Sequence, residues 1–201
     1  FIVIATENPI ESEGVYPLPE AQRDRFLLKV DVPYPRGNEE FEILRRMAIE
    51  PPQPTRILDP AVTLALQNQA SQVFVHNLVA EYVVRLVLAT RNPADFGMPD
   101  LASVIQIGCS SRATLGLVSA ARALALIHGR DYVLPTDIQT VAPDVMSHRL
   151  VLSFDAIADN VSPVQVVERI LAMVPAPTPV WSDQQRAQAH GQHRYEPDYN
   201  H

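Results

Sequence analysis

Residues 1–9 read FIVIATENP, and this stretch decides the fold class of the first part of the chain. The run from Phe1 to Ala5 is apolar and rich in β-branched residues, and it stops at the polar residues before Pro9. Such a run is typical of a strand buried on both faces, as in the middle of a parallel sheet. A central strand needs a neighbour on each side, and no residue precedes Phe1 in the sequence. We therefore expect a fragment of a longer protein, with the neighbouring strands upstream.

The residues that follow predict a further α/β unit. Pro19 precedes a short predicted helix over residues 20–25, because proline and acidic residues suit a first helical turn. Phe26 to Val32 then reads as a second strand, ended by Pro33. A helix is expected to begin near Asn38, with its apolar residues along one face.

The proline-rich stretch 51–54 marks a change, because nearly every segment after it predicts a helix. Helices are expected from Asp59-Pro60, Asn77, Ser110 or Ser111, Pro135 and Ser162-Pro163, each with an apolar stripe at helical spacing. For the helix after Ser110 the predicted stripe is Leu117, Ala121, Leu124 and Ile127. The fold class is thus α/β followed by all-α. The predicted parts are residues 1–52, a helical bundle over 53–174, and a disordered tail over 175–201.

The amino-acid composition argues against several classes of protein function. The net charge of −7 argues against general nucleic-acid binding, which needs a basic surface. The single cysteine, Cys109, allows no internal disulfide, and its residue type favours a small apolar role over that of a nucleophile. No apolar stretch is long enough to span a bilayer, so we expect a cytoplasmic protein.

Several complete active sites are excluded by residue type. A P-loop ends in Gly-Lys-Ser/Thr, whereas the only lysine, Lys29, follows Leu28. No two glycines stand two residues apart, which removes the dinucleotide-binding fingerprint. One cysteine and the absence of an HExxH sequence exclude the common zinc sites. Alone, the chain is expected to catalyse no reaction.

Three polar residues remain as candidates. Asn8 ends the predicted first strand, at the sheet edge where open α/β sheets bind ligands. Arg25 lies on the predicted short helix and could stabilise charge on a phosphoryl group in a neighbouring subunit. Arg112 begins a helix on the side away from its apolar stripe. Each also has an ordinary interpretation: a turn for Asn8, a surface ion pair with Asp24 or Glu20 for Arg25, and a solvated side chain for Arg112.

With these residues in order, the chain resembles the C-terminal half of a MoxR-type AAA+ ATPase. The resemblance rests on seven segments in family order: Ala5-Thr6-Glu7-Asn8-Pro9, residues 14–22, Asp24-Arg25-Phe26, Ala89-Thr90-Arg91, Gly108 to Ala113, Gly129 to Pro135 and His148-Arg149-Leu150. Arg23 and Ser111 stand where the family usually has an apolar residue and a proline.

The resemblance implies a role for each candidate. Asn8 would be sensor 1, Arg25 the arginine finger acting on ATP in the adjacent protomer, and Arg112 the sensor 2 arginine of a helical lid. ATP and Mg²⁺ would be held by Walker motifs upstream, in a homo-oligomeric ring that remodels or matures partner proteins. Two alternatives stay open: a non-catalytic interaction module that modulates full-length relatives, and a magnesium-chelatase-type AAA+ subunit.

Overall fold

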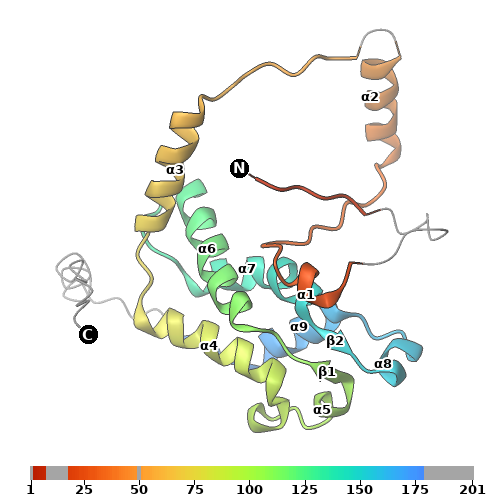
Figure 1. Ribbon diagram of the computed structural model, residues 1–201, viewed down its shortest axis with the longest axis vertical. Helices are drawn as coiled ribbons and strands as arrows, with labels where there is room; N and C mark the ends of the chain where they lie inside the picture. Colours follow the sequence, from red (N-terminus) through yellow and green to blue (C-terminus); the bar gives the residue numbers. More distant parts are fainter. Residues whose placement is uncertain (1, 8–17, 49–50, 179–201) are drawn as a thin grey trace.

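The computed structural model describes residues 2–7, 18–48 and 51–178, and these form a helix-rich structure with one small sheet (Figure 1). The elements in chain order are α1 (Glu20–Arg23), α2 (Gly37–Met47), α3 (Pro60–Gln72), α4 (Asn77–Arg91), η1 (Pro93–Phe96), α5 (Leu101–Val104), β1 (Ile105–Ile107), α6 (Ser111–Ile127), α7 (Pro135–Met146), η2 (Ser147–Arg149), β2 (Val151–Leu152), α8 (Phe154–Ala158) and α9 (Pro163–Met173). The strands β1 and β2 pair antiparallel, with Ile105 opposite Leu152.

The core lies where α4, α6, α7 and α9 pack together in the lower half of Figure 1. The largest fully buried side chains come from all four helices and include Tyr82, Leu86, Leu117, Ile138 and Ile170. Burial of apolar side chains from several amphipathic helices is what stabilises a helical bundle. The predicted helical character of this part of the chain is confirmed, apart from the small sheet of β1 and β2, which the sequence did not predict.

The helix starts follow local capping chemistry. Asp59, Ser110 and Ser162 each accept a hydrogen bond from a backbone N–H of the first turn of the helix that follows. Leu134 cannot cap α7 with its side chain, and Asp137 compensates by accepting the Leu134 N–H at 2.8 Å. The helix predicted to open at Asn77 is capped instead by His76, whose Nδ1 accepts the Leu78 N–H.

Two predicted strands are not formed. Residues 2–5 and 26–32 have no strand structure, and Ile2, Val3 and Ile4 are 73%, 61% and 86% exposed. A strand is held by ladder hydrogen bonds to a neighbouring strand. None of the described segments supplies such a neighbour to either stretch.

Other boundaries also differ from the prediction. The helix expected over residues 20–25 ends at Arg23, so that Arg25 lies in a turn. In α6, Leu117 and Ala121 are buried as predicted, whereas Ile127 is 78% exposed. Ile127 is the last residue of α6, at the end of the helix where no described element covers it.

Helix α2 stands apart from the bundle, joined to α3 by the extended residues 51–59 (Figure 1). Its predicted apolar face is present but uncovered among the described residues, with Phe41, Leu44 and Met47 all more than half exposed. The predicted tail lies outside the described residues except for 175–178, and the domain limits at 52 and 174 stay predictions.

Candidate functional site

The structure places two of the three candidate residues. Arg25 lies in the turn after α1, and Arg112 lies in the first turn of α6. Both are exposed, so a charged ligand or a second subunit could reach either guanidinium. Asn8 lies outside the described residues.

Asp24, next to Arg25 in sequence, is the centre of a polar cluster that joins α1 to the bundle. The Ser110 hydroxyl lies 3.0 Å from each oxygen of the Asp24 carboxylate, and Arg112 Nη1 donates to Oδ2 at 2.8 Å. Arg149 Nε approaches Oδ1 at 3.2 Å from the buried side. The Asp24 carboxylate therefore binds three side chains: Ser110, which caps α6, the candidate lid residue Arg112, and the buried Arg149.

The electrostatics favour the ionised form of Asp24. Burial by itself raises the pKa of the carboxyl group, but hydrogen bonds from Arg112 and Ser110 and the positive charge of Arg149 outweigh it. The pKa of Asp24 is consequently lowered from its ordinary value of 3.8. At neutral pH the cluster carries two positive charges against one negative charge, with the Arg112 side chain 49% exposed.

A tight backbone contact fixes the start of α6. Cys109 donates its N–H to Thr90 Oγ1 at 2.9 Å, and its carbonyl accepts Arg91 Nε at 2.8 Å. Gly108 lies so close to α4 that an added Cβ would be 2.5 Å from the Thr90 carbonyl oxygen. The two family segments around Thr90 and Gly108 thus meet in space, and their contact positions Ser110.

Arg25 differs from its neighbours in having no side-chain partner within the described part of the chain. Among the residues that the structure describes, its side chain makes no hydrogen bond or ion pair, although Asp24 and Glu20 are close in sequence. The surface ion pair considered from the sequence is therefore not formed with either of them. The Nε of Arg23 also has no hydrogen-bond partner among the described residues, but this atom is buried, whereas Arg25 is exposed.

Sequence reasoning missed Asp24, His148 and Arg149 as parts of this site. All three belong to segments that carry the family resemblance, but a carboxylate next to an arginine suggests a local ion pair. The actual partners of Asp24 lie 86 to 125 residues away. Arginine is also rarely buried, so nothing in the local sequence indicates that Arg149 is an interior residue.

The described part of the chain contains neither a metal-binding cluster nor a reactive thiol that could serve as an alternative functional site. It brings together no group of three or more His, Cys, Asp or Glu side chains that could hold a metal ion. Cys109 is 1% exposed, and burial raises the pKa of its thiol to about 11, which disfavours a nucleophilic thiolate. None of the described helices combines the length and apolarity needed to cross a bilayer.

Comparison with known proteins matches two parts of this chain to families. Residues 101–170 match the AAA lid domain family, and residues 1–28 match the ATPase family associated with various cellular activities (AAA). The chaperone MoxR1 of Mycobacterium tuberculosis is 55% identical over 177 residues, which cover 88% of this chain and 47% of that protein. The protein MoxR of Paracoccus denitrificans is 33% identical, over 87% of this chain and 56% of that protein.

A solved structure of a related protein has a similar fold. The crystal structure of a candidate ATPase from Cytophaga hutchinsonii superposes with a TM-score of 0.81 at 39% sequence identity, covering 86% of this chain and 53% of that one. The chain spans about half the length of the curated relatives it matches. From the lid domain, the preceding AAA segment and these relatives, we conclude that the chain belongs to the MoxR-type AAA+ ATPase family.

Proposed function

We propose that this chain supplies the lid and the arginine finger of a MoxR-type ATPase that couples ATP hydrolysis in a ring to the remodelling or maturation of partner proteins. The P-loop and the groups that hold Mg²⁺ would lie in an upstream part of the same protein. The names of the MoxR relatives support this assignment over a magnesium-chelatase-type subunit.

The observation that carries the proposal is the contrast between Arg25 and its neighbours. Asp24 and Phe26 are anchored to the bundle, while the Arg25 side chain between them is exposed and has no partner among the described residues. A guanidinium on an anchored backbone suits recognition of a phosphate that another subunit presents. An arginine finger of this kind contributes a factor of about 10³ or more to the rate of hydrolysis.

Each proposed residue has a separate task in phosphoryl transfer to water. Asn8 would orient the attacking water, and Arg25 would neutralise charge developing on the γ-phosphate of the adjacent protomer. Arg112 would reach the nucleotide of its own protomer from the lid. A phosphate there would compete with the Asp24 carboxylate for the Arg112 guanidinium, which is half-exposed and therefore accessible.

Steady-state ATP hydrolysis by the full-length protein tests the proposal. Arg25→Ala is expected to lower kcat by about 10³-fold with little change in KM, because the finger acts on the transition state. Arg169→Ala is the matched control, since Arg169 is also exposed but pairs with Asp100 on the outside of the bundle. Equal kcat values for the Arg25→Ala and Arg169→Ala proteins would contradict the finger assignment.

A further inference from the structure

The Arg149 side chain is the most completely buried charged group of the cluster. It belongs to η2, and its side chain is 2% exposed. Its guanidinium donates to the carbonyl oxygens of Asp24 at 3.3 Å, Phe26 at 2.5 Å and Leu27 at 3.2 Å, and also to Val145 within the bundle. Three of these four carbonyls belong to the backbone that carries Arg25.

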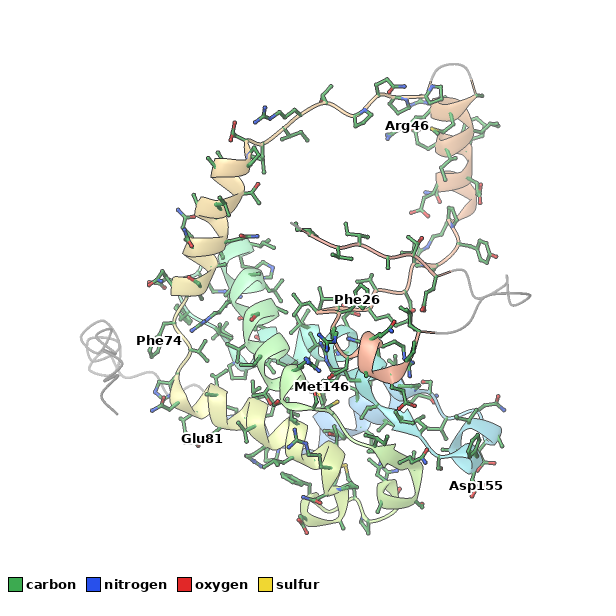
Figure 2. The ribbon with its side chains drawn as sticks, viewed as in Figure 1. Phe26, Arg46, Phe74, Glu81, Met146 and Asp155 are labelled. Atoms are coloured by element: carbon green, nitrogen blue, oxygen red, sulfur yellow. The ribbon has the colours of Figure 1, made fainter. Side chains whose placement is uncertain are left out.

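His148 lies against the same backbone, and its neutral ring can donate to one of the two carbonyl oxygens that face it. Its Nε2 lies 3.1 Å from the Phe26 carbonyl oxygen, and its Nδ1 lies 3.0 Å from the Asp144 carbonyl oxygen. The Asp144 carbonyl in turn accepts the N–H of Lys29 at 3.0 Å. Phe26, labelled in Figure 2, thus lies at a junction where the segment after α1 is bound to the end of α7 and to η2.

Close packing around Arg149 depends on a glycine in α6. Gly116 of α6 faces this junction, and an added Cβ would lie 3.1 Å from Val145, 3.4 Å from Leu27 and 3.9 Å from Arg149 Nη2. The absence of a side chain at Gly116 therefore lets Leu27 and the Arg149 guanidinium approach α6. A third element of the bundle takes part in holding the Arg25 segment.

An arginine side chain is rarely buried in a protein interior. Removing a guanidinium from water is strongly unfavourable unless its charge is paired and its N–H groups are satisfied. A methionine or leucine would fill a similar volume without that cost, so burial alone does not account for the choice of arginine. The two terminal nitrogens of the planar guanidinium instead match a set of four carbonyl oxygens, while Nε faces the Asp24 carboxylate, an arrangement that the point charge of lysine cannot reproduce.

We propose that Arg149 and His148 are positioning residues that hold the backbone on both sides of Arg25 against the lid, and so set the direction in which the finger points. This inference rests on the proposed role of Arg25. It adds that the lid of one protomer determines the geometry of the finger offered to the next. Neither Arg149 nor His148 would contact the nucleotide.

Hydrogen exchange on this chain tests the anchoring without reference to ATP. Arg149→Lys keeps the charge but not the fork, and we expect the Lys29 amide to exchange at least about tenfold faster, while the buried amides of α4 and α6 keep their rates. Arg169→Lys is the control, because it changes an arginine of the same bundle that contacts Asp100 instead. Unchanged exchange at Lys29, or a uniform increase at every amide, would overturn the anchoring.

Steady-state kinetics of the full-length protein test whether the position of Arg25 set by Arg149 affects ATP hydrolysis. Arg149→Lys is expected to lower kcat by roughly 10²-fold with KM unchanged, since a shift of about 1 Å in a catalytic group has an effect of that size. If Arg25→Ala lowers kcat and Arg149→Lys does not, the positioning role is wrong and the finger assignment stands. If Arg25→Ala has no effect, the finger assignment itself fails, whatever the exchange rates show.

Discussion

The carboxylate of Asp24 and the guanidinium of Arg112 lie 2.8 Å apart, although 88 residues separate them in the sequence. This ion pair connects the segment that carries Arg25 to the first turn of the lid helix that carries Arg112. Arg149 binds the same carboxylate from the interior. The proposed finger and the proposed sensor 2 residue are therefore linked within one protomer through a single side chain.

Replacing Asp24 with asparagine should destabilise the bundle. The change removes the only carboxylate that the structure shows beside the buried Arg149, and an unpaired interior charge costs roughly 3 kcal/mol or more. Asp100→Asn is the control, because its pair with Arg169 is exposed and should contribute less than about 1 kcal/mol. Urea unfolding of the two proteins measures the difference, and equal losses would show that the cluster contributes no more than a surface pair.

Gly108→Ala should also be strongly destabilising. An alanine Cβ would lie 2.5 Å from the Thr90 carbonyl oxygen, and this clash is with backbone that cannot rotate away. We expect a loss of at least about 2 kcal/mol in unfolding free energy, in the upper range for overpacking. Gly37→Ala, at a position with open space around it, should change stability by no more than about 1 kcal/mol. A Gly108→Ala protein as stable as the Gly37→Ala protein would show that the loop does not hold α6 as described.

Cys109 should be unreactive while the chain is folded. Burial raises the pKa of its thiol to about 11, so almost no thiolate is present at neutral pH, and the sulfur is shielded from reagents. Alkylation by iodoacetamide, followed by mass spectrometry, should be negligible in buffer and complete in denaturant. Rapid labelling of the folded protein would contradict the burial of this residue.

Acid should destabilise the chain in two stages. The pKa of His148 is lowered because burial and the charge of Arg149 disfavour the imidazolium, although the Phe26 and Asp144 carbonyls favour it. The unfolded chain therefore binds a proton at His148 more readily, and the stability from this residue, present above about pH 6.5, is lost as the pH falls through the folded value. The pKa of Asp24 is lowered as well, so its contribution is complete above about pH 4 and is lost as the pH falls further.

Unfolding free energies measured from pH 8 to pH 3 check both stages. In a His148→Gln protein the decline just below pH 6.5 should be absent, while the decline at lower pH remains. A decline of the same size below pH 6.5 in both proteins would assign it to another group.

The helical half of the fold could be predicted because its signals are local. A capping side chain such as Ser110 or Ser162 lies within three residues of the N–H that it accepts, and the apolar stripes repeat every helical turn. Both are visible in a short window of sequence. The same windows also suggested strands at residues 1–5 and 26–32, where the structure has none among its described residues, because a strand depends on a neighbour that the local sequence does not encode.

The candidate site was predicted only in part, for a related reason. Exposed arginines such as Arg25 and Arg112 can be selected by their place at the start or end of an element. The role of Asp24 depends on Ser110, Arg112 and Arg149, and the fold alone brings these together. The ordinary preference of arginine for the surface also points away from an interior Arg149.

Arg25 is proposed to act on ATP bound by an adjacent subunit, and complementation between two inactive full-length proteins tests this role most directly. One carries Arg25→Ala, and the other has its P-loop lysine replaced by alanine; this chain alone serves as the negative control and should hydrolyse no ATP. Mixed rings contain interfaces in which an intact P-loop meets an intact Arg25, so the mixture should recover ATP hydrolysis that neither protein shows separately. A mixture that assembles into rings but stays as inactive as its components would contradict the claim.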